Sequence, residues 1–223
     1  MNDQYRLPTN ASPRHYALRI EPDLDAETFR GSVSIDIEVT EASDTIVLNN
    51  DGLEIIDLSV TTTDGAGATT LDTTFTVDVD TQRLTIHGDV PAGDAVVECT
   101  FSGSFDENLV GFYLSRFSDD NGVDRTIATT QFEATHARKA FPCWDEPASK
   151  ATFDIQLVID AEHQAFANAA ELRREHLDDG RHLVTFATTM KMSTYLVAFV
   201  VGPLDATEPV DVDGVPLRVV SVA

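Results

Sequence analysis

The sequence predicts an all-β protein, built mainly from antiparallel strands in a sandwich-like arrangement. Apolar and polar residues alternate with a period of two in several short segments, which is typical of strands with one buried face. Turn-forming pairs such as Asp179-Gly180 and Asp213-Gly214 separate these segments. We find no long segment with the period of an amphipathic helix. The 223 residues, 42% of them hydrophobic, are enough for a sizeable core.

The expected strands follow one another along the chain. The clearest alternation is in residues 32–39, where every second residue is Val or Ile. The same pattern occurs in residues 16–20, 75–79 and 153–159. Residues 61–74 resemble a linker, but a long surface hairpin explains them equally well. Residues 195–201 are apolar on both faces, so we expect a central strand that is covered on both sides.

The chain is strongly acidic, with 38 acidic and 15 basic residues and a formal net charge of −23. Phosphate backbones bind basic surfaces, so this charge argues against a nucleic-acid partner. An anionic membrane surface is disfavoured for the same reason. Lys is scarce among the basic residues, and the acidic residues, mostly Asp, are spread through the chain. We interpret this composition as a solvated acidic surface, with adaptation to high salt as a hypothesis.

The first ten residues, MNDQYRLPTN, contain no basic segment followed by an apolar stretch, so they do not resemble a secretory signal. No later segment has the roughly 18 consecutive apolar residues that span a membrane. We therefore expect a cytoplasmic protein with no membrane partner. The two cysteines, Cys99 and Cys143, are too few for a disulfide scaffold, and we expect both to be buried thiols.

The sequence contains none of the local catalytic motifs considered next. The six histidines do not form the i, i+4 pair of a His-Glu-x-x-His zinc helix, and we expect each to lie at the surface or in a turn. The sequence has neither a Gly-x-Ser-x-Gly turn nor a phosphate-binding glycine loop. Its Asp-Gly turns are compatible with a calcium-binding adhesion sandwich, but no EF-hand calcium loop occurs. These signatures predict no catalytic residue and no metal site in this chain.

Residues 135–150 interrupt the strand pattern. This stretch places charged residues beside Phe141, Pro142 and Trp144, and Pro147 closes it. Such a mixture does not fit a strand, so we expect an ordered loop or a short helical turn that lines a site.

Residues 131–147, with the sequence QFEATHARKAFPCWDEP, closely resemble the first signature of the gluzincin aminopeptidases. This family includes aminopeptidase N, puromycin-sensitive aminopeptidase and the tricorn-interacting factors. Residues 111–115 (GFYLS) and 191–199 (KMSTYLVAF) are similar to the family's segments before and after this block, and so is the opening of the chain, with RLP and PRHY. The resemblance covers nearly the whole chain. It implies that residues 1–223 form a single, saddle-shaped, all-β N-terminal domain.

The resemblance assigns Glu133 to the free α-ammonium group of a peptide substrate. An aminopeptidase must recognise a chain end, and a carboxylate in a desolvated pocket pairs strongly with a cation. Gln131 and Ala134 would line the same pocket, although an outward structural position fits Gln131 equally well. The resemblance also implies a cis peptide bond between Glu133 and Ala134, which is rare before a residue other than proline.

For Arg138, Asp145 and Glu146, a structural role is favoured over substrate contact. We expect a buried ion-pair network that holds the loop in shape. His136 departs from the family pattern, which commonly has an acidic residue at this position. If that acid normally pairs with a basic neighbour, a histidine weakens or re-routes the pair.

The family's zinc-binding helix and its Gly-x-Met-Glu-Asn strand do not occur in this sequence. The resemblance therefore implies that zinc and the catalytic groups belong to a separate catalytic domain of the parent enzyme. This chain alone would be inactive and would hold no cofactor. Its partners would be the amino end of a peptide and that missing domain. The alternative is a free-standing β-sandwich module that binds peptides or proteins without cleaving them.

Overall fold

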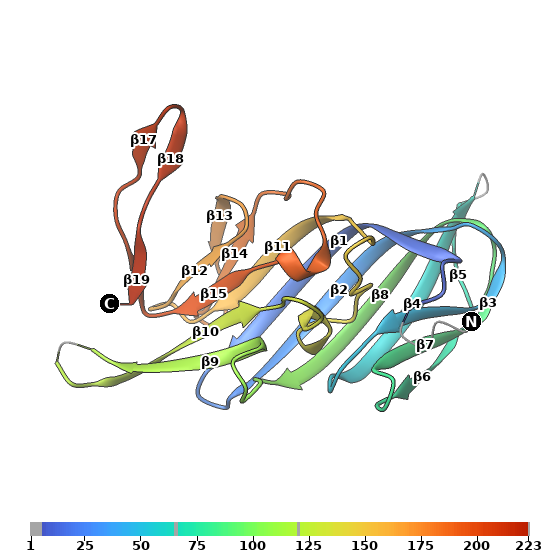
Figure 1. The fold of residues 1–223 in the computed structure, drawn as a ribbon, viewed down its shortest axis with the longest axis horizontal. Helices are drawn as coiled ribbons and strands as arrows, with labels where there is room; N and C mark the ends of the chain where they lie inside the picture. Colours follow the sequence, from blue (N-terminus) through green and yellow to red (C-terminus); the bar gives the residue numbers. More distant parts are fainter. Residues whose placement is uncertain (1–5, 65–66, 120, 223) are drawn as a thin grey trace.

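In the computed structural model, which describes residues 6–64, 67–119 and 121–222, almost every element is a β-strand (Figure 1). The strands are β1 (Ala11–Asp23), β2 (Thr28–Val39), β3 (Ser43–Asn49), β4 (Glu54–Asp64), β5 (Gly67–Thr70), β6 (Thr74–Asp78), β7 (Arg83–Val90), β8 (Gly93–Ser104), β9 (Gly111–Ser118), β10 (Asp124–Gln131), β11 (Thr152–Ile159), β12 (Gln164–Ala167), β13 (Glu171–His176), β14 (His182–Phe186), β15 (Phe199–Gly202), β16 (Leu204–Ala206), β17 (Val210–Val212), β18 (Val215–Leu217) and β19 (Val220–Val222). The helical elements of the described residues are two 3-10 turns, η1 (Ala137–Lys139) and η2 (Thr194–Leu196), and neither is long enough to cross a membrane. The all-β prediction is confirmed.

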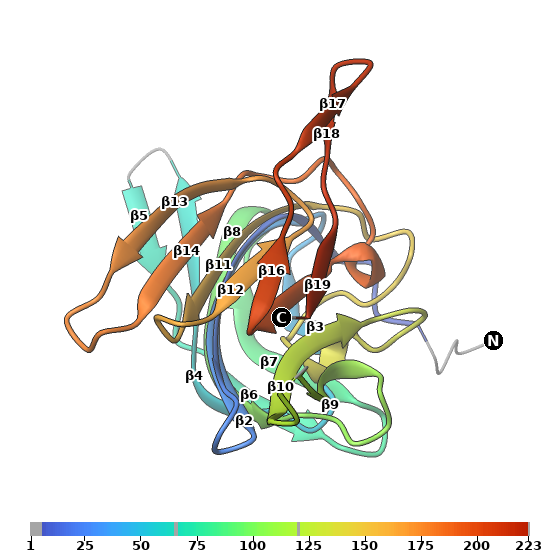
Figure 2. The same cartoon turned by 90° about the vertical axis from the view of Figure 1, so that its left-hand side faces the viewer.

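Eight strands form the largest sheet, in the order β13-β14-β11-β1-β2-β8-β4-β5. Its long strands bend into a curved layer (Figure 2). Neighbouring strands are antiparallel except β1 and β11, which pair in parallel from His15 opposite Thr152 to Ile20 opposite Leu157. A parallel pair needs a long crossover, and most of the chain lies between these two strands. The sheet is therefore mixed at this one pair, where the sequence predicts antiparallel strands.

The inner face of the large sheet carries the core. Along β2, every second residue from Val33 to Val39 is buried, and the residues between them are at least partly exposed. The alternation in the sequence therefore predicts this strand correctly, as it does β1 and β11. At the centre of the core, Tyr16 of β1 stacks on Phe153 of β11 with ring centroids 4.7 Å apart. Such aromatic pairs bury a large apolar area.

Smaller sheets complete the layers. One has four strands in the order β12-β15-β10-β9, and another has three in the order β3-β7-β6. Their buried side chains join those of the large sheet in a single hydrophobic cluster. Within it, Phe112 of β9 meets Phe199 of β15 edge to face, with centroids 5.0 Å apart. Sheets that share one core agree with the predicted sandwich-like fold.

The segment 195–201 differs from its prediction, because only its second half, from Phe199, is a strand. The side chain of Asn168 explains the break. Its Oδ1 accepts a hydrogen bond from the backbone N–H of Ala198, and its Nδ2 donates to the carbonyl of Leu196. These backbone groups are therefore engaged before a neighbouring strand can pair with them. β15 itself lies between β12 and β10, as expected of a central strand, but the predicted cover on both faces is wrong, because Leu196 and Ala198 are exposed and Val200 is half-buried.

The segment 61–74 contains a hairpin arm and not a linker. β4 and β5 pair from Thr61 opposite Thr70 to Thr63 opposite Ala68. The paired residues of β5 are exposed on both faces, which agrees with the surface hairpin that the sequence left open as one of two interpretations.

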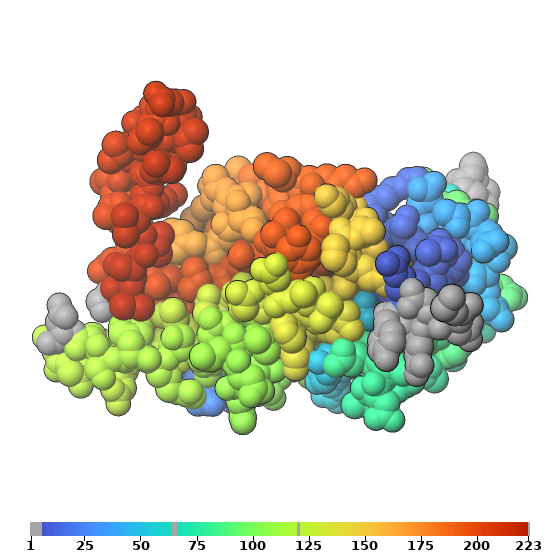
Figure 3. Space-filling model, in the orientation of Figure 1, coloured from blue at the N-terminus to red at the C-terminus, as the bar shows by residue number. Residues whose placement is uncertain are grey.

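The last strands project from the body of the molecule. β16 pairs with β19, and β17 with β18 forms a hairpin that stands clear of the other sheets (Figure 1, Figure 3). Gly214 in its turn has a φ of 83°, a left-handed conformation that glycine adopts without a steric cost. Its apolar side chains are exposed: Val210, Val212, Val215 and Leu217.

Candidate functional site

The signature loop, residues 132–151, leaves β10 after Gln131 and leads into β11. Its aromatic side chains fold back into the core. Phe132 and Phe141 meet edge to face with centroids 6.0 Å apart, and Phe141 meets Tyr16 in the same way at 6.2 Å. All three rings are buried. The loop is therefore an ordered part of the core, and η1 is the short helical turn expected within it.

Backbone hydrogen bonds tie the loop to three other elements. The N–H of Trp144 donates to Oη of Tyr16 on β1 at 3.1 Å, and its carbonyl accepts from Oγ1 of Thr194 in η2 at 2.9 Å. Cys143 and Asn49, the last residue of β3, exchange two backbone hydrogen bonds of 2.8 and 3.2 Å. The backbone groups of Cys143 and Trp144 are thus paired, as a loop in the core requires, whereas the buried indole N–H of Trp144 has no partner among the described residues.

A buried ion pair closes the middle of the signature loop. Nε of Arg138 lies 3.0 Å from Oδ2 of Asp145, and the guanidinium also donates to the Asp145 carbonyl and, at 3.0 Å, to Oε1 of Gln82. The Asp145 side chain is 1% exposed and that of Arg138 is 12% exposed. Burial raises the pKa of Asp145, and the Arg138 guanidinium opposes part of this rise.

A second ion-pair cluster fixes η1. Nζ of Lys139 lies 2.9 Å from a carboxylate oxygen of Asp106 and 3.2 Å from one of Asp51. Burial acts to lower the pKa of Lys139, but the hydrogen bonds and charges of the two aspartates outweigh it and raise this pKa. For Asp106 burial acts to raise the pKa, and the hydrogen bond from Lys139 lowers it below its usual value. Lys139 and Asp106 therefore hold each other ionised.

Glu146 makes a different contact from its neighbour Asp145. Its Oε1 accepts a hydrogen bond of 2.6 Å from the backbone N–H of Leu7, near the start of the described chain. Asp145 thus binds within the signature loop, while Glu146 joins the loop to the segment that precedes β1.

The residues proposed to meet the substrate lie on the exposed rim of the loop. The side chains of Gln131, Glu133 and Ala134 are exposed. Oε1 of Gln131 accepts a hydrogen bond of 3.0 Å from the backbone N–H of Glu133. The Glu133–Ala134 peptide bond is cis. Among the residues that the structure describes, no hydrogen bond or ion pair engages the Glu133 carboxylate, so it is available to a cation.

His136 shapes the turn that bears Glu133. Its backbone N–H donates to the carbonyl of Phe132 at 2.9 Å, and its own carbonyl accepts from the N–H of Lys139 at 3.2 Å. The side chain is half-buried and lies close enough to Asp145 for a charge on the imidazole to act on that carboxyl group. The position that departs from the family pattern is thus electrostatically linked to the buried Arg138–Asp145 pair.

Nothing in the described ranges resembles a metal centre, because no three His, Cys, Asp or Glu side chains there lie together as ligands. Cys99 and Cys143 are free, buried thiols, as predicted. Burial raises the pKa of Cys143 well above its ordinary value, which keeps it protonated and unreactive. The signature loop therefore presents the Glu133 carboxylate at its exposed rim, and the buried Arg138–Asp145 ion pair holds the loop in shape.

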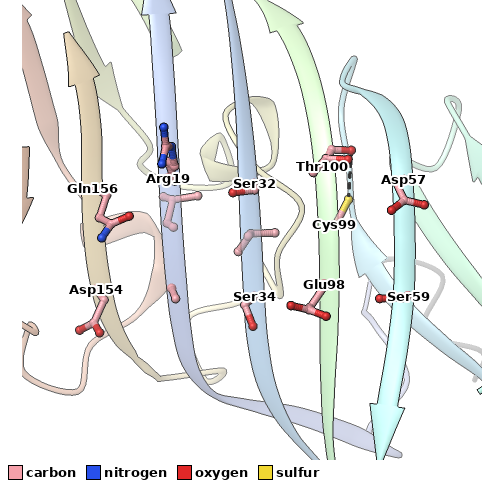
Figure 4. Close-up of a pocket in the computed structure, with 13 residues that line it drawn as sticks. Arg19, Ser32, Ser34, Asp57, Ser59, Glu98, Cys99, Thr100, Asp154 and Gln156 are labelled. Carbon is pink, nitrogen blue, oxygen red and sulfur yellow. Dashed lines mark hydrogen bonds between the residues drawn. The ribbon is translucent and has the colours of Figure 1, made fainter. Parts of the chain in front are cut away.

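A groove on the outer face of the large sheet is separate from the signature loop. It has a volume of about 470 Å³, and its polar side chains come from β11, β1, β2, β8 and β4 (Figure 4). Ser32 and Ser34 of β2 lie in its middle, with Glu98 of β8 beside them. The outermost strands carry Asp154 on β11 and, on β4, Asp57 and Ser59. The core side chains of the signature loop pack against the inner face instead.

Sequence reasoning missed several residues that hold the loop. Asn49 accepts a hydrogen bond from the N–H of Asp145, 96 positions away, and Gln82 lies 56 positions from Arg138. Asp51 and Asp106 were missed for the same reason. No local pattern links residues so far apart, because the sheet order decides which of them meet.

One expectation about the histidines is wrong. His182 is buried on β14, and its Nε2 lies 2.9 Å from Nδ1 of His176 on β13. The surface prediction fails because the sequence analysis does not identify residues 182–186 as a strand, in which His182 points inward.

This chain is similar to a known protein family. The family model described as the Peptidase M1 N-terminal domain matches residues 12–196. Puromycin-sensitive aminopeptidase of Caenorhabditis elegans is 37% identical over 218 residues, which cover 97% of this chain and 23% of that protein. Aminopeptidase M1 of Arabidopsis thaliana is 38% identical over 217 residues, which cover 96% of this chain and 24% of that protein. The chain spans about a quarter of the length of these relatives.

Proposed function

This chain belongs to the peptidase M1 family and corresponds to the family's N-terminal domain, and we propose that it anchors the amino end of a peptide substrate for an aminopeptidase. The observation that carries the proposal is the state of Glu133. Its carboxylate is exposed and unpaired among the described residues. On the same loop, by contrast, Arg138 and Asp145 form an ion pair with each other, and Lys139 forms one with Asp106.

The chemistry of a free amino terminus fits this carboxylate. An α-ammonium group is a compact cation with hydrogen-bond donors, and an ionised carboxylate is its natural partner. The pair strengthens when a covering surface removes water from around it. Because Glu133 would hold the chain end, the scissile bond would lie one residue away. Exopeptidase specificity would then follow from the position of one charge.

Gln131 and Ala134 would complete the rim of the pocket. The side-chain oxygen Oε1 of Gln131 already accepts a hydrogen bond from the backbone N–H of Glu133. The side-chain NH₂ of Gln131 is therefore the group left to bind a substrate or the rest of the enzyme. Ala134 has a small side chain, which leaves the space beside Glu133 open to the first residue of a peptide. The preferred residue there would depend on side chains outside this chain.

Peptide hydrolysis itself would take place in the remainder of the polypeptide. We assign to that catalytic domain the zinc ion that the resemblance implies, together with the groups that activate water. The described residues of this chain bring together no metal-ligand cluster. In this proposal the chain binds and orients the substrate, and taken alone it does not hydrolyse peptides.

The same proposal gives the exposed hairpin a partner. β17 and β18 pair only with each other among the described residues, and their apolar side chains are open to solvent. An isolated two-stranded hairpin is marginally stable in water and gains most from a covering surface. We propose that the catalytic domain supplies this surface. The cytoplasmic location expected from the sequence stays a prediction.

The test is substitution of Glu133 in the longer polypeptide that contains this domain. Glu133→Gln keeps the size of the side chain and removes its charge, so kcat/KM for an unblocked aminoacyl substrate should fall about 100-fold, in the range found for a lost buried charge pair. Glu162→Gln, an exposed acid in the turn before β12, is the control and should leave kcat/KM unchanged. A fall below about threefold for Glu133→Gln would refute the anchoring role.

The rival is a free-standing module that binds peptides or proteins without cleaving them. Reading the gene beyond the codon for Ala223 separates the two. A frame that continues into a His-Glu-x-x-His helix supports the enzyme, and a stop codon there supports the module. In the second case, the peptide affinity of the wild-type chain and of Glu133→Gln becomes the measurement, with N-acetylated peptide as the control ligand.

A further inference from the structure

Two histidines face each other across the β13–β14 hairpin at the edge of the large sheet. His176 and His182 are directly opposite in register. Nε2 of His182 lies 2.9 Å from Nδ1 of His176, and the rings meet nearly at right angles with centroids 4.3 Å apart. This distance is that of a hydrogen bond, so one of the two nitrogens carries a hydrogen and the other a lone pair.

The two rings differ in their surroundings. His176 is exposed, whereas His182 shares the buried face of β14 with Val184 and Phe186. Nδ1 of His182 is buried and has no hydrogen-bond partner among the described residues. A bare lone pair at this atom is the less costly state, because a buried N–H without an acceptor loses its hydrogen bond to water.

The two rings have four nitrogens, and two of these carry a hydrogen in the neutral pair. In the neutral pair, Nε2–H of His182 donates to Nδ1 of His176, the second hydrogen sits on Nε2 of His176, and Nδ1 of His182 stays bare. A third proton has two places to go. On Nδ1 of His182 it makes a buried N–H with no protein acceptor, and on Nδ1 of His176 it sets two hydrogens against each other. Both choices destabilise the closed hairpin.

The charged neighbours on β13 do not relieve this cost. Arg174 lies two residues before His176, on the same face of β13, and adds a positive charge beside the pair. Its guanidinium bonds to Glu171 at 2.9 Å and to Gln164 at the start of β12. Glu175 pairs with Arg173 at 3.0 Å.

Of the residues in the turn between β13 and β14, Asp179 and Arg181 are likewise engaged, and Asp178 is exposed to solvent. Arg181, next to His182, pairs with Asp179 at 2.7 Å and with Glu21 of β1 at 3.2 Å. In the turn between β11 and β12, a carboxylate oxygen of Asp160 lies 3.7 Å from Nδ1 of His163. Each acid in these pairs therefore already has a basic neighbour, and a new imidazolium at His182 would compete for it.

We propose that the His176–His182 pair is a proton-sensitive latch that holds edge strand β13 on β14 while both rings are neutral and releases it when a third proton binds. Opening the hairpin would give a third proton a place in water, and a histidine in water is ordinarily protonated below about pH 6.5. The open form then binds more protons than the closed form, so the free energy of opening falls as the pH falls through this range. A metal ion between the two rings would need the same buried N–H, which favours a proton device over a metal site.

Amide hydrogen–deuterium exchange of the whole chain tests the latch, with rates corrected for the intrinsic pH dependence. Between about pH 7.5 and pH 5.5, a range that spans histidine titration, the protection of β13 and β14 amides should fall at least tenfold more than that of β2 and β8. If the protection of the β13 and β14 amides changes between the two pH values only as much as that of β2 and β8, the proposal is overturned.

Substitutions separate the latch from general acid sensitivity. His182→Phe keeps an apolar ring in the buried place and should abolish the extra loss of protection at acidic pH. His176→Thr changes the exposed partner and should reduce that loss. It serves as the test if His182→Phe folds poorly. His87→Asn is the control, since His87 makes an exposed cross-strand hydrogen bond to Thr76 on another sheet. An equal effect of His87→Asn would refute the assignment.

Nitrogen-15 NMR of the imidazole rings gives a readout that does not depend on any variant. At about pH 7.5, above the range of histidine titration, Nδ1 of His182 should show the chemical shift of an unprotonated, pyridine-like nitrogen. A protonated Nδ1 of His182 at this pH would remove the basis of the latch.

Discussion

The guanidinium of Arg138 and the carboxylate of Asp145 lie 3.0 Å apart inside the signature loop, with the Asp145 side chain only 1% exposed. The pair joins the start of η1 to the segment that leads toward β11. It therefore fixes the path of the chain that follows the turn carrying Glu133. Its removal should test how far the exposed rim depends on the buried framework.

Arg138→Met leaves the Asp145 carboxylate buried without its partner. We expect the free energy of unfolding to fall by about 3–5 kcal/mol, as for other broken buried pairs. Urea unfolding at neutral pH measures it. The loss should shrink in acid, because burial already raises the pKa of Asp145 and protonation removes the stranded charge.

Two further variants check this interpretation. The double variant Arg138→Met/Asp145→Leu removes both charges and should recover more than half of the loss. Arg116→Met breaks an ion pair with Glu27 in which both side chains are 59% exposed, so it should change stability little. Equal losses for Arg138→Met and Arg116→Met would contradict the structural role of the buried pair.

Glu21 predicts an acid-sensitive contribution to stability. Burial acts to raise its pKa, but the hydrogen bond and charge of Arg30, with the charges of Arg19 and Arg181, lower it below its ordinary value of 4.5. A lowered folded-state pKa contributes stability above pH 4.5, and this is lost as the pH falls through the folded value. Glu21→Gln should cost about 1–2 kcal/mol at neutral pH and progressively less in acid.

The measurement for Glu21 is a series of thermal unfolding curves from neutral to acidic pH for wild type and variant. The two stability profiles should converge at low pH, where the carboxyl group is protonated in both the folded and the unfolded state. A constant difference at every pH would show that the effect of the substitution is one of packing and not of charge.

The two thiols should resist alkylation in the folded protein. Burial and then the charge of Asp57 raise the pKa of Cys99 to about 12, and burial raises that of Cys143 as well. At about pH 8, where an unperturbed thiol is appreciably ionised, iodoacetamide should label neither residue until denaturant is added. Mass spectrometry locates the label, and rapid labelling of Cys143 would contradict a loop packed in the core.

The acidic surface predicts that salt stabilises the chain. With a net charge of −23, self-repulsion opposes the folded state, and it is screened as the Debye length shortens from roughly 10 Å at about 0.1 M salt to roughly 3 Å at about 1 M. The melting temperature should rise by at least about 4 °C, which corresponds to about 1–2 kcal/mol for a domain of this size. A melting temperature that stays level in both NaCl and KCl would argue against salt adaptation.

Local patterns determined the fold class and several of the long strands. Alternation of apolar and polar residues located β1, β2 and β11, because a strand with one wet face needs side chains of two kinds. It failed for residues 195–201, where the side chain of Asn168 takes the backbone hydrogen bonds that a longer strand would need. Alternation also says nothing about direction, so the parallel pairing of β1 with β11 was not predicted.

For the candidate site, the sequence by itself named Glu133, Gln131 and Ala134 through a resemblance carried by one unbroken segment, and it named Arg138 and Asp145 as structural. Tertiary structure alone decided which distant side chains complete the framework, among them Asn49 and Gln82, and that His176 meets His182 on a sheet edge. The physical reason is that a residue's chemistry is local, whereas its partners depend on strand order and register, which the whole core fixes together.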